Sequence, residues 1–343
     1  MKAVRFPEPG RAELVEVPVP RPQSGEVLIR VKAAGICASD VGAFLGKHDV
    51  RKPPVITGHE LAGEIVEVGS GSVARRVGER VAVEPHVGCG TCVFCREGHY
   101  HECPRKRFIG VGEWIGAFAE HVVATEVMCH PIPERMSFDE GAALEPFCVG
   151  LHAVRRSGLR IGESAAVLGV GTIGMMTLLA ARCTAPGWIG VSDLSAFKRM
   201  TAVRCGAHFA VDPVVQDPVE TFQNATNGLG VDVVFVAVPS NEVVRQAVRV
   251  CRRMGRLVII ASFFEGGVLE LRQIQVRERT VIGTSMYTGD DYRLAIRLWE
   301  RGSLGDLESL ITERITLEEA PAVVAALAHG HRPDTIKTII HFD

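Results

Sequence analysis

The sequence predicts an α/β fold with two domains: a mainly-β domain, and a doubly wound domain built on a parallel sheet. Three observations support this prediction. Up to about residue 124, short strands of partial period-two alternation are separated by glycine and proline turns. From 165 to about 283, apolar strands alternate with helical stretches. A length of 343 residues is also enough for two domains.

The individual elements follow from this periodicity. Strands of the first domain are expected at 15–17, 27–31, 63–68 and 81–83. Strands of the second domain are expected at 166–168, 189–191, 231–236 and 257–260. The helix between the last two strands should cover 243–254 and end at Gly255. The tail returns to mixed structure, with helices at 292–299 and 317–328 and a closing strand at 336–342.

The composition is that of an ordinary globular protein, with 47% hydrophobic and 23% charged residues. The net charge of −2 gives no electrostatic reason to expect nucleic acid as a partner. The first residues lack the apolar core of a signal peptide, and the longest apolar stretch, 165–181, is short and interrupted by glycines. We therefore expect no membrane partner and a cytoplasmic location, where thiols stay reduced.

Four cysteines in one short run form the most specific motif. Their spacing is C-x2-C-x2-C-x7-C, and the residues are Cys89, Cys92, Cys95 and Cys103. Four thiolates on one loop can surround a single tetrahedral zinc ion without help from the rest of the fold. Neighbouring glycines allow the tight turns that this needs. We favour a structural zinc ion at these cysteines.

Two other interpretations of the four cysteines remain open. One is a disulfide-bonded loop, which a reducing compartment disfavours. The other is an iron–sulfur cluster, because bacterial ferredoxins also begin C-x2-C-x2-C and place a proline after the fourth cysteine. Here Pro104 follows Cys103, but the ferredoxin run ends with the shorter gap C-x3-C.

A glycine-rich turn predicts a dinucleotide site. The motif G-x-G-x-x-G follows the strand at 166–168 and opens a helix, and its residues are Gly169, Val170, Gly171, Thr172, Ile173 and Gly174. The glycines permit a tight turn and let a pyrophosphate approach the N-terminus of the helix.

Asp193 predicts which dinucleotide is bound. It follows Gly174 by 19 residues and lies at the end of the next strand. A carboxylate at this place accepts hydrogen bonds from the ribose hydroxyls and repels a 2′-phosphate, which favours NAD over NADP. The alternative is that Asp193 caps the following helix, although Ser195 could fill that place instead.

Three further motifs fall in the first domain. They are Gly35-Ile36-Cys37-Ala38-Ser39-Asp40, Gly58-His59-Glu60 and Leu144-Glu145-Pro146. Cys37 and His59 are well-matched ligands for a second zinc ion, which a carboxylate can complete. Any one of these residues alone would more often have a structural role. Their occurrence together with the cysteine run and the dinucleotide motif is unlikely to be due to chance.

With these motifs the chain resembles the zinc-dependent medium-chain alcohol dehydrogenases over essentially its whole length. The resemblance implies a GroES-like catalytic domain over 1–146 and 285–343, which holds both zinc ions. It implies a Rossmann NAD-binding domain over 147–284, with the active site in the cleft between the two domains.

The resemblance also assigns roles to individual residues. Cys37 and His59 bind the catalytic zinc, Glu60 is a direct or exchanging ligand, and Asp40 orients His59. The Ser39 hydroxyl hands the substrate proton away. The cofactor is expected at Gly169, Gly171, Thr172, Ile173, Gly174, Asp193, Lys198 and Lys337, of which Lys337 can reach the pyrophosphate.

Two positions narrow the branch of the family. Glu145 stands where the ethanol-type enzymes have a cysteine, and a glutamate followed by proline is typical of polyol, butanediol and threonine dehydrogenases. Glu145 is therefore another candidate zinc ligand, with Cys148 one helical turn later as an alternative. Many relatives end the proton relay with a histidine where this chain has Gly42, and His48 is a candidate replacement.

These features predict an NAD-dependent enzyme with two zinc ions per chain that oxidises a secondary alcohol of a polyol, diol or cyclitol to a ketone. The alternatives are an L-threonine 3-dehydrogenase, a non-catalytic NAD-binding regulator and an iron–sulfur electron carrier. The regulator should have lost a zinc ligand, and here every ligand is present. Resemblance to bacterial relatives implies a homo-oligomer, with a tetramer favoured and the apolar strand at 280–284 as its pairing edge.

Overall fold

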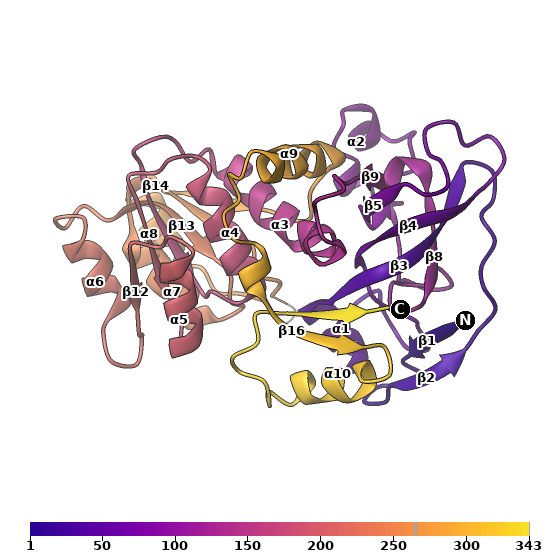
Figure 1. Cartoon of the computed structure of the whole chain (residues 1–343). Helices are drawn as coiled ribbons and strands as arrows, with labels where there is room; N and C mark the ends of the chain where they lie inside the picture. The colour runs from indigo at the N-terminus through magenta and orange to yellow at the C-terminus, as the bar shows by residue number, and fades with distance from the viewer. Residues whose placement is uncertain (264–265, 343) are drawn as a thin grey trace. The chain divides into compact units, whose positions relative to one another are not determined.

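The structure, a computed structural model, describes residues 1–263 and 266–342 (Figure 1). The chain forms two compact units. Unit 1 contains Met1–Glu145, Thr288–Glu300 and the stretch from Leu307 onward. Unit 2 contains Pro146–Tyr287 and Arg301–Asp306. The short stretch 301–306, which the sequence analysis placed in the first domain, therefore packs with the second unit.

Unit 1 is organised around one long strand, β3 (Glu26–Ile36), which carries three neighbours. Its sheet has the order β16-β17-β3-β4-β5-β9, and β8 pairs with the first half of β3. The other strands are β16 (Ile311–Thr316), β17 (Lys337–His341), β4 (Glu60–Val68), β5 (Arg80–Val83), β9 (Cys129–Pro131) and β8 (His121–Thr125). All pairs are antiparallel except β16 with β17.

Smaller elements complete unit 1. Two minor sheets pair β1 (Lys2–Arg5) with β2 (Glu13–Glu16), and β6 (His86–Val87) with β7 (Arg107–Phe108). The helices are α1 (Ala38–Phe44), α2 (Val93–Arg96), η1 (Tyr100–Glu102), η2 (Glu126–Met128), α9 (Gly289–Glu300), η3 (Glu308–Leu310) and α10 (Ala320–Ala328). Helix α3 (Phe138–Ser157) starts in unit 1 and continues into unit 2. Fully buried side chains such as Phe6, Ile29 and Leu61 form the core of unit 1.

Unit 2 is a six-stranded parallel sheet of order β12-β11-β10-β13-β14-β15. Numbered from its own first strand, this is the order 3-2-1-4-5-6 of a doubly wound dinucleotide-binding sheet. The strands are β10 (Ser164–Leu168), β11 (Trp188–Ser192), β12 (Phe209–Val211), β13 (Val231–Val236), β14 (Cys251–Ile259) and β15 (Thr280–Gly283). The helices are α4 (Thr172–Arg182), α5 (Ala196–Arg204), α6 (Pro218–Asn224), α7 (Asn241–Val250) and α8 (Leu271–Gln275).

The helix predicted over 243–254 is too long. Helix α7 ends at Val250, and β14 begins at Cys251. Val231 of β13 pairs with Cys251, but Val233 pairs with Arg256, so β14 bulges between these two pairs. Met254 lies in this bulge and has a left-handed φ of 56°. Gly255 therefore lies inside a bulged strand and does not cap a helix.

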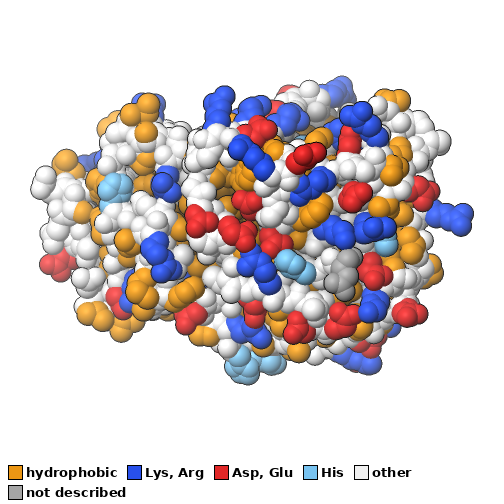
Figure 2. All heavy atoms as spheres, in the orientation of Figure 1, with side chains coloured by type: hydrophobic (Ala, Val, Ile, Leu, Met, Phe, Trp, Pro, Cys, Tyr) orange, Lys and Arg blue, Asp and Glu red, His pale blue; other side chains and the backbone are white. Residues whose placement is uncertain are grey.

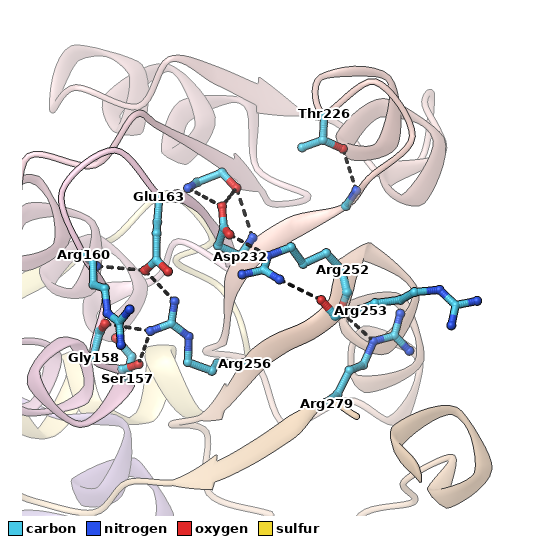
Figure 3. Close-up of polar contacts among 12 residues, drawn as sticks. Ser157, Gly158, Arg160, Glu163, Thr226, Asp232, Arg252, Arg253, Arg256 and Arg279 are labelled. Carbon is cyan, nitrogen blue, oxygen red and sulfur yellow. Dashed lines mark hydrogen bonds and ion pairs between the residues drawn. The ribbon is translucent and has the colours of Figure 1, made fainter. Parts of the chain in front are cut away.

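A polar network joins the starts of three strands in unit 2 (Figure 3). Asp232 accepts hydrogen bonds from the backbone N–H of Ser164 at 2.8 Å and from its hydroxyl at 2.6 Å, and from Arg252 Nε at 2.6 Å. Arg256 donates to Glu163 at 2.5 Å. Burial alone would raise the pKa of Asp232, but the Ser164 and Arg252 donors outweigh it and the pKa is lowered.

Positive and negative side chains lie interspersed on the face of the molecule drawn in Figure 2. Within the described residues, no helix combines the length and the apolar character that a membrane crossing requires.

Candidate functional site

The four-cysteine motif folds into one local cluster in unit 1. Cys92 is the N-cap of the short helix α2, and this places Cys95 one turn further on. The sulfur atoms of Cys92 and Cys95 are 3.5 Å apart, those of Cys89 and Cys95 are 4.0 Å apart, and all four lie within 4.8 Å of one another. Tetrahedral zinc with Zn–S bonds of about 2.3 Å needs sulfur atoms about 3.8 Å apart. The cluster therefore fits a single metal ion.

Hydrogen-bond donors surround the sulfur atoms. Cys103 Sγ accepts from the backbone N–H groups of Cys89 at 3.4 Å and of Arg105 at 3.3 Å, and Arg105 Nη2 lies 3.3 Å from Cys89 Sγ. A hydrogen bond from the Thr91 side chain lowers the pKa of Cys89 to about 5. Burial, and then the hydrogen bond with Cys92, raise the pKa of Cys95 to about 11. None of the ten cysteines forms a disulfide in the structure, and sulfur atoms 3.5 and 4.0 Å apart are too distant to be bonded.

A second group of possible ligands is assembled by the register of the main sheet. Cys37 follows β3 directly, while His59 and Glu60 stand at the start of β4. Because Gly35 pairs with Glu60 across β3 and β4, these two strand ends meet. One ligand atom from each of Cys37, His59 and Glu60 lies within 4.8 Å of the others. Thiolate, imidazole and carboxylate are the donors that a catalytic zinc site uses.

Asp40 is fully buried behind His59, and its carboxylate lies at ion-pair distance from the imidazole. Its carboxylate accepts from Thr57 Oγ1 at 2.6 Å, from Gly58 N at 3.2 Å and from Cys37 N at 2.9 Å. Its Oδ1 atom is 3.5 Å from His59 Nδ1. An acceptor at Nδ1 leaves Nε2 to bind a metal ion.

The electrostatics of this pair follow from their mutual contact. Burial would raise the pKa of Asp40, but the His59 charge and the hydrogen bonds outweigh it and the pKa is lowered. Burial and Arg51 would lower the pKa of His59, but Asp40 outweighs both and the pKa is raised to about 10. Asp40 therefore stays ionised and can compensate a positive charge at the imidazole.

Glu60 has a partner that the sequence did not reveal. Lys337 is 1% exposed, and its Nζ donates to Ile36 O at 3.0 Å and to the two Glu60 oxygens at 2.9 and 2.6 Å. A Cβ at Gly35 would lie 1.9 Å from Glu60 Oε2, so only glycine leaves room for this carboxylate. The three ammonium protons of Lys337 are thus used within unit 1, and its expected contact with the cofactor pyrophosphate stays a prediction.

Glu145 is buried in helix α3. Burial lowers the pKa of Lys337, but the charges of Glu60, Cys37 and Glu145 outweigh it and the pKa is raised. Glu145 therefore belongs to the same charged surroundings as Glu60. Cys148, the alternative ligand, is fully buried in α3.

Helix α1 and the loop after it each bring one more side chain to the site. Ser39, which is half-buried, accepts a hydrogen bond from Arg51 Nη1 at 3.0 Å. His48 Nδ1 accepts from the backbone N–H groups of Val50 at 3.2 Å and Arg51 at 3.1 Å. A Cβ at Gly42 would lie 3.8 Å from His48 Cβ, so His48 packs beside the position where relatives carry the relay histidine.

In unit 2 the glycine-rich turn has the geometry of a phosphate cradle. Gly169 has φ 90°, and a Cβ at Gly174 would lie 1.9 Å from Gly169 O, so both positions require glycine. Gly171 is the N-cap of α4, and a Cβ there would meet nothing within 4 Å. The space in front of this helix N-terminus is therefore open, while Thr172 and Ile173 form its partly exposed first turn.

Asp193 lies next to this turn, at the end of β11. Its carboxylate accepts from Val170 N at 2.8 Å and from Ser195 N at 2.9 Å. Ser195, not Asp193, is the N-cap of α5, and its hydroxyl accepts from Lys198 N at 3.2 Å. The helix-cap alternative for Asp193 is therefore not what the structure shows, and half-buried Lys198 lies in the first turn of the same helix.

Known proteins that resemble this chain share both its fold and its motifs. Residues 23–134 match the family model of the alcohol dehydrogenase GroES-like domain, and residues 169–301 match that of the zinc-binding dehydrogenases. The chain is 35% identical over 324 residues to sorbitol dehydrogenase from Bacillus subtilis (strain 168). The matched region covers 93% of this chain and 91% of that protein. The chain belongs to the zinc-dependent medium-chain alcohol dehydrogenase family. This dehydrogenase is an oxidoreductase that acts on CH–OH groups.

Solved structures agree with this assignment. The structure of 2R,3R-butanediol dehydrogenase from Bacillus subtilis has a TM-score of 0.90 and 31% identity, and covers 100% of this chain and 99% of that chain. A protein from Sinorhizobium meliloti 1021 described as a zinc-binding dehydrogenase and bound to NADP has a TM-score of 0.93 and 32% identity, with 99% of both chains covered. The dehydrogenase therefore has the GroES-like and Rossmann folds, and its family uses zinc and a nicotinamide cofactor.

Proposed function

We propose that this dehydrogenase uses zinc and NAD to oxidise a secondary alcohol of a polyol, diol or cyclitol to a ketone, and that it also catalyses the reverse reaction. The observation that carries the proposal is the convergence of Cys37, His59 and Glu60 within 4.8 Å, with Asp40 behind the histidine. The relatives named as sorbitol and butanediol dehydrogenases support the class of substrate.

The residues present fit two zinc ions per chain. The cluster of Cys89, Cys92, Cys95 and Cys103 would hold a structural ion, because four sulfur atoms leave no position for a substrate. Cys37 and His59 would hold the catalytic ion, with Glu60 or Glu145 as the third ligand. When bound, this zinc would polarise the alcohol oxygen and NAD would accept the hydride.

The protein's own groups position and move the proton. Ser39 would take the proton of the alcohol, and the hydrogen bond from Arg51 to its hydroxyl oxygen supports this role by restricting the side chain. Asp40 keeps the His59 ring in one orientation, and Lys337 restrains Glu60 through both of its oxygens. With Gly42 at the end of the relay, no imidazole at that position accepts the proton from Ser39.

The cofactor preference rests on Asp193. The open space in front of Gly171 would receive the pyrophosphate, and the carboxylate beside it would accept from the ribose and repel a 2′-phosphate. Lys198 would add a positive charge next to the ribose, and Lys337 is the second basic residue assigned to the cofactor. We therefore propose NAD as the preferred cofactor, although one relative has been crystallised with NADP.

An exposed strand supports a homo-oligomer, with a tetramer favoured. Strand β15 is the last strand of the sheet in unit 2, and its Val281 is 37% exposed. An uncovered apolar edge is a site for pairing with a second copy. We also propose a cytoplasmic location, a compartment in which the thiols of both candidate metal sites would stay reduced.

One experiment tests the activity and the metal content together. The purified chain is analysed for metals before and after mild chelation and assayed with NAD or NADP on diols, polyols, cyclitols and L-threonine. We expect two zinc ions, loss of activity before the second ion leaves, and a preference for NAD. Highest activity with L-threonine would support the threonine dehydrogenase alternative, and no activity on any alcohol would support the regulator.

A further inference from the structure

Arg51 is an unusual buried cation in the candidate active site of unit 1. It lies in the loop after α1 and is 6% exposed. Its Nη1 atom is 3.0 Å from the hydroxyl oxygen of Ser39. Arg51 is therefore next to the hydroxyl that should contact the reacting alcohol.

The guanidinium of Arg51 has few partners, and its Nε has none among the described residues. It has five N–H donors, and among the described residues the single side-chain acceptor within hydrogen-bonding distance is Ser39 Oγ. Its Nε is buried without a partner, and no described carboxylate forms an ion pair with it within 4.0 Å. Burying a charged group without a partner is costly, so such a residue marks a place where a ligand supplies the missing charge.

The other buried cation of the site shows the contrast. Lys337 has all three of its N–H donors occupied, two of them by Glu60. In the metal-loaded site Arg51 is thus the cation whose donors remain available to a ligand.

We propose that Arg51 recognises an anionic group on the substrate, so that the preferred alcohols carry a carboxylate or phosphate near the carbinol that is oxidised. A carboxylate accepts two parallel hydrogen bonds from a guanidinium fork, and a phosphate does the same. A ligand whose carbinol lies at Ser39 would bring a group on a neighbouring carbon to the remaining donors of Arg51. This proposal rests on the dehydrogenase activity proposed above and specifies its substrate class.

Three compounds with the same carbon chain test the proposal. D-Sorbitol ends in a neutral hydroxymethyl group, D-gluconate in a carboxylate and D-sorbitol 6-phosphate in a phosphate. Binding of each to the zinc-loaded chain is measured by titration calorimetry without cofactor, and kcat/KM is measured with NAD. We expect at least one anion to bind about 10- to 100-fold more tightly than sorbitol, as a hydrogen bond to a charged group would provide.

Variants separate recognition from positioning. Arg51→Gln should remove the preference for the anion in both binding and kcat/KM, Arg51→Lys should retain part of it, and the exposed neighbour Lys52→Gln should retain all of it. Equal affinity of the wild type for the three compounds would overturn the proposal. Equal loss for all three in Arg51→Gln would also overturn it, since Arg51 would then act through Ser39 alone.

Two further outcomes distinguish this inference from the proposed function. If Arg51→Gln weakens binding of NAD but leaves the ratio between gluconate and sorbitol unchanged, the anion is the cofactor's pyrophosphate and the inference is wrong. If no compound is oxidised but the binding preference depends on Arg51, the proposed function fails while the inference stands.

Discussion

The two candidate metal sites of this dehydrogenase are built in opposite ways. The four thiols between Cys89 and Cys103 come from one short stretch of chain and fold around themselves. The second site joins Cys37 after β3 to His59 and Glu60 at the start of β4, and Lys337 reaches across 301 positions of sequence to Ile36. The first site is therefore encoded by residue spacing, and the second by the register of a sheet. This difference predicts what each mutation should damage.

Removing one ligand from each site should separate chemistry from stability. His59→Ala should reduce kcat by about a thousand-fold or more, because metal polarisation of the alcohol contributes several kcal/mol to the barrier. Cys92→Ser should remove the other zinc ion and lower the thermal midpoint. Metal content, turnover and calorimetric melting of both variants check these expectations.

The matched control is Cys183→Ser, which changes a half-buried cysteine outside both clusters. It should retain both metal ions and full activity. The comparison between the two sites would fail if His59→Ala lost the metal ion of the thiol cluster, or if Cys92→Ser lost turnover while its folded state kept the same thermal midpoint.

The Lys337–Glu60 pair should contribute more to stability than any exposed pair. Lys337→Met leaves the Glu60 carboxylate buried without its partner, and breaking a buried pair in this way costs about 3–5 kcal/mol. Lys2→Met breaks the exposed pair with Glu318 and should cost about 1 kcal/mol or less. Thermal midpoints measured side by side compare the two, and similar shifts would show that Lys337 does not stabilise the assembled site.

The smallest effect concerns His48 and depends on pH. Burial, and then the charge of Arg51, lower the pKa of His48, so the folded chain keeps this imidazole neutral and its Nδ1 free to accept from Val50 and Arg51. His48→Ala should cost about 1–2 kcal/mol at pH 8, where both N–H groups lose their acceptor.

This contribution should disappear in acid. Below the ordinary histidine pKa of about 6.5 the unfolded chain binds a proton that the folded chain resists, so the wild type loses stability as the pH falls. The difference in thermal midpoint between wild type and His48→Ala should therefore shrink between pH 8 and pH 5. Lys47→Ala, an exposed neighbour, should show no such trend. A constant difference across this range would contradict the role given to His48.

The sequence predicted the two sheets, and it singled out the residues that the structure brings together at the two candidate metal sites, because glycine, cysteine and histidine motifs are local in the chain. It did not predict the contacts that depend on the fold. Lys337 meets Glu60 because Thr338 pairs with Ile36 and Gly35 pairs with Glu60, and neither register can be read from one segment. Arg51 lies in an irregular loop, whose path no periodicity describes.

The errors have a similar cause. The helix predicted over 243–254 continued into Arg252 and Arg253 because these residues suit a helix. In the structure they belong to the bulged start of β14, where pairing with β13 overrides local preference. For Asp193 the motif spacing predicted a place beside the glycine-rich turn, and there its carboxylate accepts from Val170 N; its ribose role stays a prediction.

The discontinuous composition of unit 1 has a consequence for biosynthesis. Unit 2 is almost one continuous stretch, so its parallel sheet has all six strands once Gly283 has left the ribosome. Unit 1 begins earlier in the chain but lacks β16 and β17, and Lys337 with them, until the last stretch is translated. Until then residues 33–36 of β3 lack their β17 partner and Glu60 lacks its ammonium partner, although every strand of unit 2 has already been made.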